Sequence, residues 1–300
     1  MSQILVSGLV NLEVTLRVER FPIDYFPVRY PFHGIGVTVS GVGFNVAKAL
    51  TRLGNQVTFL SLIGDEPVGE LARSTLRSEG ISDTLVLGRL AETAQSVILY
   101  DNEGRRQINV DLKDVQEQTY PEELALPALE GCAMAALCNV NFSRPLLSMA
   151  RAASVPIATD VHAIAELDHP YDRDFMAAAD VLFMSHERLP CPPEEWARRV
   201  YDRYGTKVIV IGLGAEGALL HVARDGLLER IPAHTTREVV STIGAGDALF
   251  AAFIDGYARG LPPKAALERA SLYASYKIGE AGAAEGLLDA DGLDELVACQ

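Results

Sequence analysis

Short apolar runs that favour β-strands alternate with stretches of helical periodicity along most of the chain. The apolar runs lie at 4–10, 57–64, 133–140, 155–161, 180–184 and 207–214. Between them lie helical stripes, formed by Val46, Ala49, Leu50 and Leu53 within 45–53 and by Leu71 and Leu76 within 68–78. Parallel strands need crossover connections, and helices are the usual ones. The alternation therefore predicts an α/β sandwich with a mostly parallel sheet and helices on both faces.

Two segments depart from this alternation. Residues 13–39 are rich in aromatic residues and proline, which favour exposed extended structure over a crossover helix. Residues 95–112 contain two predicted strands joined by a turn at 101–104. Together the segments predict a small sheet that projects from a single domain spanning residues 1–300. Such a sheet is typical of a lid or a dimer surface, and an ordinary edge of the main sheet is the alternative.

The composition narrows the class of protein. With 49% hydrophobic and 22% charged residues, the chain is typical of a soluble globular protein. Its 26 Lys and Arg against 40 Asp and Glu give a formal net charge of -14, which disfavours binding to nucleic acid. No apolar stretch approaches the roughly 20 residues that span a membrane, and the start lacks a signal-peptide pattern. We therefore expect a cytoplasmic protein, in which the four scattered cysteines are buried, reduced thiols.

The first of three glycine-rich segments is GLGAEG at 212–217, which matches the GxGxxG pattern and follows a predicted strand. A dinucleotide fingerprint should open a helix, but the residues that follow, 218–222, favour a strand. A turn between two strands is therefore the favoured interpretation. A nicotinamide-dependent dehydrogenase is the least supported function.

The second segment is SGVGFNVA at 40–47, which runs directly into a predicted helix. Glycines before a helix let backbone amides approach a ligand closely, and Asn45 offers both a donor and an acceptor to hydroxyl groups. The alternative is a tight turn in which Asn45 caps the helix.

The third segment is STIGAGDALF at 241–250, followed by apolar residues at helical spacing. Its glycines would lie at a helix N-terminus, where unpaired amides and the helix dipole attract anions. Asp247 among these groups suits a residue that handles a proton. Stabilisation of the first helical turn is the alternative role for its carboxylate.

The segments at 244–247 and 40–54, together with LIGDEPVGELARSTLRSEGI at 62–81, resemble signatures of the ribokinase or phosphofructokinase-B-like carbohydrate kinase family. The resemblance covers nearly the whole chain. It implies a three-layer α/β domain with a β lid that transfers a phosphoryl group from ATP, with Mg²⁺, to a primary hydroxyl of a sugar or nucleoside.

The resemblance also implies roles for individual residues. Asp247 would be the general base, and the backbone N–H groups of Gly244, Ala245 and Gly246 would stabilise the transferred phosphoryl group. The implied substrate-binding residues are Asn11, Glu13, Gly41, Gly43 and Asn45. The implied ATP-binding residues are Ser185, Gly212, Gly214, Gly217 and Thr242, with the segment 270–282 over the adenine.

The chain departs from the family pattern at several positions. Glu13 stands where the family mostly has Asp, and Ser40 and Ser241 replace a Gly and an Asp of the two signatures. The family's Asn-x-x-Glu segment falls on Ser185 and Arg188 here, with Glu187 adjacent. Glu187 is therefore the predicted metal ligand.

Three functions stay open at this point. Glu13 and Asn45 suit a polyhydroxylated ligand, which favours a sugar kinase. The aromatic residues of 13–39 leave a nucleoside kinase as the alternative, since they could stack on a base. The replaced Asn-x-x-Glu positions leave a catalytically weak, sugar-binding regulatory protein. An apolar lid sheet also suits the surface of a homodimer.

Overall fold

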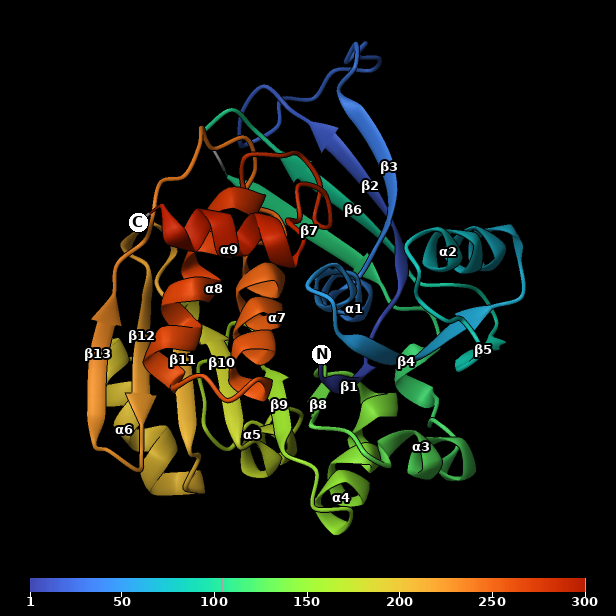
Figure 1. Cartoon of the computed structure of the whole chain (residues 1–300). Coiled ribbons are helices and arrows are strands. Elements are labelled where there is room, and N and C mark those ends of the chain that lie inside the picture. Colours follow the sequence, from blue (N-terminus) through green and yellow to red (C-terminus); the bar gives the residue numbers. More distant parts are fainter. Residues whose placement is uncertain (104, 300) are drawn as a thin grey trace.

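A computed structural model of the protein describes residues 1–103 and 105–299, and within them the predicted central sheet is present (Figure 1). Its strands are β1 (Gln3–Ser7), β4 (Gln56–Gly64), β5 (Val86–Leu90), β8 (Met134–Leu137), β9 (Ile157–Asp160), β10 (Val181–Ser185), β11 (Val208–Gly212), β12 (Ala218–Val222) and β13 (Leu227–Ile231). Their order across the sheet is β13-β12-β11-β10-β9-β8-β1-β4-β5. Strands β12 and β13 pair antiparallel to their neighbours, and the other pairs are parallel. The prediction of a mostly parallel sheet is confirmed.

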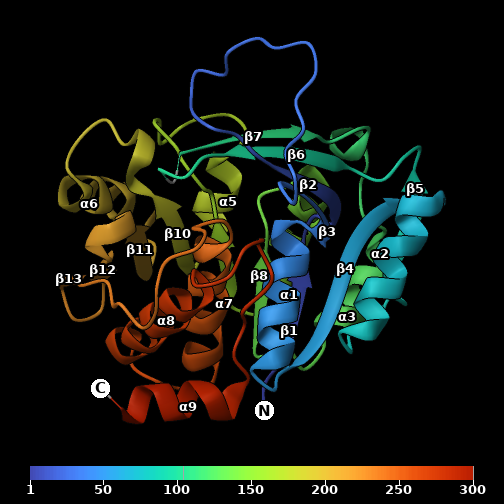
Figure 2. The same ribbon diagram turned by 90° about the horizontal axis from the view of Figure 1, so that it is seen from above.

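Helices cover both faces of this sheet, because successive strand side chains point to opposite sides. In β1, Ile4 and Val6 belong to one apolar core, and Leu5 belongs to the other. The first core contains residues of α1 (Val42–Arg52), α2 (Pro67–Ser78), α7 (Ala245–Ala258), α8 (Pro263–Lys277) and α9 (Ala290–Ala298). The second contains residues of α3 (Glu122–Leu129), α4 (Arg144–Ala152), α5 (Arg173–Ala178) and α6 (Pro193–Tyr204). Figure 2 shows the resulting three layers.

The helical stripes are confirmed on α1 and partly wrong on α2. The four stripe residues of α1 are buried, although the helix begins at Val42, earlier than predicted. On α2, Leu76 is buried but Leu71 is 46% exposed. Five residues correspond to about 1.4 helical turns, so these two leucines cannot share a face. The buried partners of Leu76 on α2 are Gly69 and Ala72.

The lid is a separate sheet, as predicted. It consists of β2 (Asn11–Arg17), β3 (Ile35–Ser40), β6 (Gln95–Tyr100) and β7 (Arg106–Asp111) in the order β3-β2-β6-β7. The middle pair, β2 and β6, is parallel, and the outer pairs are antiparallel. The connection between β2 and β3 loops out from the body of the molecule (Figure 2). The predicted turn at 101–104 includes Gly104, which lies outside the described residues.

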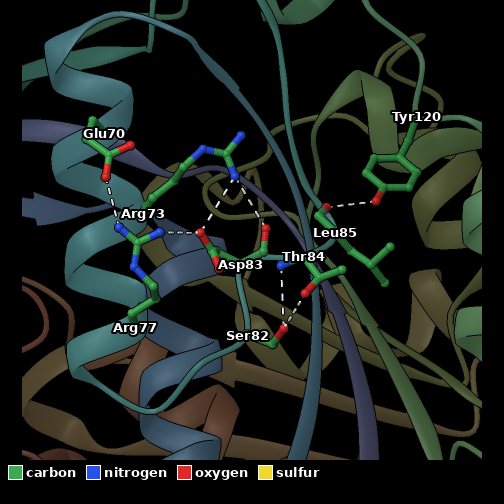
Figure 3. Close-up of polar contacts among 8 residues, drawn as sticks. All are labelled: Glu70, Arg73, Arg77, Ser82, Asp83, Thr84, Leu85 and Tyr120. Atoms are coloured by element: carbon green, nitrogen blue, oxygen red, sulfur yellow. Dashed lines mark hydrogen bonds and ion pairs between the residues drawn. The ribbon is translucent and has the colours of Figure 1, made fainter.

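Polar contacts fix the crossover from α2 to β5 at the edge of the main sheet (Figure 3). The carboxylate of Asp83 lies 2.9 Å from Arg77 Nη1 and 3.7 Å from Arg73 Nη1. Beyond it, the hydroxyl of Tyr120 donates to the carbonyl oxygen of Leu85 at 2.7 Å. This edge is thereby tied to the second helical layer.

Two sequence-based expectations concern the surroundings of the protein. In the part of the chain that the structure describes, no helix has the length and apolar character needed to cross a bilayer. The expectation of buried cysteines holds for Cys138 alone, because Cys132 and Cys191 are half-buried and Cys299 is exposed.

Helices α1 and α7 are tied together at their C-terminal ends. Asn55 Nδ2 donates to Oδ1 of the fully buried Asp255 at 2.7 Å, and Arg259 Nε donates to the same oxygen at 2.7 Å. This connection fixes how the N-termini of the two helices lie relative to each other.

Candidate active site

The N-terminus of α7 presents unpaired backbone amides. Gly244 precedes the helix with φ of 77°, and a Cβ at this position would lie 2.1 Å from the carbonyl oxygen of Ala283. Only glycine therefore fits there. The amide of Ala245 donates to the carbonyl of Thr242 at 3.2 Å, whereas those of Gly244 and Gly246 have no protein acceptor within residues 1–103 and 105–299. Unpaired amides at a helix N-terminus attract an anion.

Asp247 lies in the first turn of the same helix, with its side chain directed toward α1. Its Oδ2 accepts a hydrogen bond from Asn45 Nδ2 at 2.7 Å. Burial raises the pKa of Asp247 to about 6; the Asn45 hydrogen bond and His162 act in the opposite direction, and Asp160 raises it further. At neutral pH this carboxylate is mostly ionised, and its raised pKa makes it a better base than an exposed aspartate.

Asn45 reaches Asp247 because the start of α1 packs tightly on the end of β1. A Cβ on Gly43 would lie 2.3 Å from the carbonyl carbon of Gly8, so neither backbone could come as close with a larger residue. Helix α1 begins at Val42 after Gly41, whose φ is 109°. The alternative in which Asn45 caps the helix is wrong, since Asn45 lies within the first turns and is 4% exposed.

The lid strand β2 supplies two further polar side chains, Asn11 and Glu13, which are 4% and 5% exposed. Asn11 Nδ2 donates to Ser96 Oγ at 2.7 Å. Among the described residues, Asn11 Oδ1 and Glu13 Oε1 have no hydrogen-bond partner. Burial raises the pKa of Glu13, which a hydrogen bond with Ser40 opposes and the charge of Asp247 reinforces. Buried acceptors of this kind need donors, and ligand hydroxyls would supply them.

The predicted ATP-binding residues gather at the carboxyl edge of the main sheet. Ser185 ends β10 and is paired with Gly212 at the end of β11. Gly214 follows in the short 3-10 helix Gly214–Glu216, and Gly217 leads into β12. The segment 212–217 is therefore the turn between two strands that the sequence favours. Ligands of open α/β sheets bind at this edge.

A hollow of about 560 Å³ lies between this edge and the lid, lined by Arg105, Arg106, Ile108, Glu187 and Thr242. Arg106 Nη1 donates to the carbonyl oxygen and the hydroxyl of Thr242, at 3.1 and 3.2 Å. Thus the structure brings the predicted residues Glu187 and Thr242 to one cavity. Within residues 1–103 and 105–299, no group of three or more His, Cys, Asp or Glu side chains gathers to hold a metal ion.

Sequence reasoning missed several charged residues at the site. Asp160 ends β9 and His162 follows it, and both influence the pKa of Asp247, as does Lys277 at the end of α8. The position of Asp160 at the end of a predicted strand was a usable signal. Lys277 lies in the segment 270–282, which the resemblance places over the adenine, but no pattern singles out this residue, and its place depends on contacts between distant loops.

A sequence model described as pfkB family carbohydrate kinase matches residues 1–290. The chain belongs to this pfkB family. Among its relatives, an ATP-dependent ribose-1-phosphate kinase of Halopiger xanaduensis is 28% identical over 94% of each chain. An acarbose 7(IV)-phosphotransferase of Actinoplanes sp. is 26% identical over 92% of this chain and 91% of that enzyme. A solved structure of a microbiome-derived acarbose kinase superimposes with a TM-score of 0.88, at 26% identity and with 99% of each chain covered.

Membership of the pfkB family makes the protein a sugar or nucleoside kinase, that is, a phosphotransferase of an ATP-dependent family. The predicted ribokinase-like fold is confirmed. The dehydrogenase alternative is wrong, because the GxGxxG segment leads into a strand instead of a helix.

Proposed function

We propose that this protein is an ATP-dependent kinase that phosphorylates a primary hydroxyl of a small sugar or sugar derivative. The observation that carries the proposal is the position of Asp247, a base with a pKa of about 6, in the same helical turn as the unpaired amides of Gly244 and Gly246. One group handles the proton that leaves the acceptor hydroxyl. The others bind the charge of the incoming phosphoryl group.

In the proposed reaction, Asp247 takes the proton of the acceptor hydroxyl while the oxygen of that hydroxyl forms a bond to the γ-phosphorus of ATP. The bond from phosphorus to the bridging oxygen breaks, and ADP leaves with that electron pair. The amides of Gly244 and Gly246 donate to the oxygens of the transferred group. The amide of Ala245 joins them when it gives up its hydrogen bond to the carbonyl of Thr242. Such transfer needs mainly positioning and electrostatic stabilisation from the protein.

The acceptor is proposed to be a sugar because the lid offers acceptors for hydroxyl groups. Asn11 Oδ1 and Glu13 Oε1 are buried oxygens that receive no hydrogen bond from the residues that the structure describes, and they lie on the strand that leads from β1 into the lid. Most of the aromatic side chains that suggested a nucleoside are turned to solvent instead, although Phe21 is half-buried. Tyr25, Tyr30 and Phe32 are 91%, 76% and 81% exposed. Substrate contacts are further assigned to Gly41, Gly43 and Asn45.

ATP is proposed to bind along Ser185, Thr242 and the turn with Gly212, Gly214 and Gly217. The donor set fits a Mg²⁺ ion held chiefly by the phosphates of ATP, because Glu187 is the single carboxylate among the described residues that line the hollow. When bound there, Mg²⁺ would neutralise charge on the β- and γ-phosphates.

A ligand panel and one variant test the proposal. Thermal unfolding is measured with sugars and nucleosides, with and without a nonhydrolysable ATP analogue, and ADP release is measured with ATP. We expect sugars to stabilise the protein and to be phosphorylated. Asp247→Asn should lower kcat by about 10²- to 10⁴-fold while the stabilisation by sugar persists. Stabilisation by nucleosides alone, or full activity of Asp247→Asn, would overturn the proposal.

A further inference from the structure

One buried charge has no part in the reaction described above. Lys277 is the last residue of α8, and its side chain is fully buried. Its Nζ donates to the carbonyl oxygen of Ile243 and, at 2.5 Å, to that of Gly282. In the part of the chain that the structure describes, no carboxylate pairs with it as a salt bridge. A buried ammonium held only by carbonyls is costly and needs a reason.

The two carbonyls belong to the loops that shape the anion-binding turn. Ile243 directly precedes Gly244, and Gly282 directly precedes Ala283, against which Gly244 packs. The same loops also meet through the amides of Val240 and Ser241, which donate to the carbonyl of Ile278 at 2.8 and 3.0 Å. Lys277 therefore fixes the backbone segment from which the unpaired amides project.

The charges around Lys277 come from several elements. Burial lowers the pKa of Lys277 to about 8, and Glu285, Asp247 and Glu13 oppose this, whereas Arg106 of the lid lowers it further. The charges of three carboxylates thus act on the ammonium, and the phosphates of ATP would add more negative charge in the proposed complex. Its positive charge offsets theirs at short range.

We propose that Lys277 is a positioning residue for phosphoryl transfer: its ammonium clamps the carbonyls of Ile243 and Gly282 and so aims the amides of Gly244 and Gly246 at the γ-phosphate. This inference rests on the proposed function. The lysine is tethered to α8, so its charge stays at the site. Removal of its charge should therefore weaken binding of the γ-phosphate more than binding of the rest of the nucleotide.

Binding measurements test this role without an acceptor substrate. Affinities for ADP and for a nonhydrolysable ATP analogue are measured by calorimetry on wild type, Lys277→Met, Lys277→Arg and the control Lys264→Met, whose lysine is exposed and pairs with Glu229. We expect Lys277→Met to weaken binding of the analogue about tenfold and that of ADP less than twofold. Lys277→Arg should keep most of the affinity, and Lys264→Met all of it. Equal losses for both nucleotides in Lys277→Met, or none, would refute the proposal.

Catalysis and pH give independent readouts. Once a sugar substrate has been identified, Lys277→Ala should lower kcat by about 10²-fold and change the KM of the sugar by less than threefold. Ammonium chloride should raise the kcat of this variant at least tenfold, whereas sodium chloride should not. If Lys277→Met does not fold, wild type decides: analogue affinity must fall between pH 7 and 9.5 while ADP affinity stays constant. A pH-independent ratio contradicts the inference. Failure of all sugars to react would contradict the proposed function alone, because the binding arm needs no acceptor.

Discussion

Two carboxylates of the site, Glu13 and Asp247, have raised pKa values for the same main reason, which is burial. They come from the lid and from α7, and the charge of Asp247 also raises the pKa of Glu13. Their roles in the proposed reaction differ, since Asp247 moves a proton and Glu13 accepts a hydrogen bond. The two roles can be distinguished by the kinetic constants that they affect.

The pH dependence of kcat/KM should report Asp247. Its pKa of about 6 means that the base is protonated below this pH, so activity should fall about tenfold for each pH unit on the acid side. The same shift has the opposite effect on stability, because the folded state binds the proton more tightly than the unfolded chain. This contribution is present below about pH 4 and is lost as the pH rises through about 6. Asp247→Asn should therefore raise Tm at pH 8. A lower Tm at that pH would contradict the view that burial of the ionised carboxylate destabilises the folded state.

Glu13→Ala tests the hydrogen bonds to the acceptor. Loss of a buried charged acceptor should raise the KM of the sugar about 10- to 100-fold and leave the KM of ATP unchanged. The matched control is Glu19→Ala, whose side chain is 86% exposed on the same lid. Steady-state kinetics with each substrate varied in turn gives both constants. An unchanged sugar KM in Glu13→Ala would place the acceptor elsewhere.

At this scale the sequence predicted the individual residues better than their partners. Asp247 and Asn45 each stand in a glycine-rich segment before a helix, which is a local signal. Their hydrogen bond joins positions 202 residues apart, which no local pattern encodes. Lys277 is harder still, because the two carbonyls that its ammonium binds come together only once the loops at 243 and 282 meet.

Among the elements, α1 and α7 have the strongest influence on the site, and Asn55 connects them through Asp255. Asn55→Ala should leave part of this buried carboxylate unsatisfied and lower the free energy of unfolding by about 1–3 kcal/mol. Urea titration measures the loss. Asn109→Ala, on the exposed strand β7, should change it by less than about 0.5 kcal/mol. Equal effects of the two variants would show that the connection is unimportant.

The prediction of elements succeeded where local periodicity determines the element and failed where contacts between distant backbone segments determine its ends. The apolar run at 4–10 suggested one strand, but β1 ends at Ser7 and β2 begins at Asn11 in the other sheet. The break lies at Gly8, whose backbone contacts Gly43 of α1. Both halves of the run are apolar, so hydrophobicity could not locate the break.

For the whole molecule, the lid has two unlike faces. Side chains of directly paired residues point to the same side, so Val14, Val37 and Val97 share the face opposite to Glu13. Val37 and Val97 are 58% and 42% exposed, and Ile35 on the same face is 60% exposed. An apolar face of this kind is typical of an interface.

We expect two copies of the chain to pair through this face. Val37→Glu with Val97→Glu should convert a dimer into a monomer in sedimentation experiments, because four carboxylates would be buried without partners. Leu126→Glu, at a 43% exposed position on α3, should leave the dimer intact. A wild-type monomer at about 10 μM would contradict this expectation.

The separation of Asn45 from Asp247 also governs when activity can arise during synthesis. Asp247 is encoded 202 residues after Asn45, and Lys277 follows it by another helix. A ribosome must therefore have synthesised residue 247 before these two side chains can meet. A chain that terminates shortly before residue 247 would contain the four lid strands but not the carboxylate that we propose as the base.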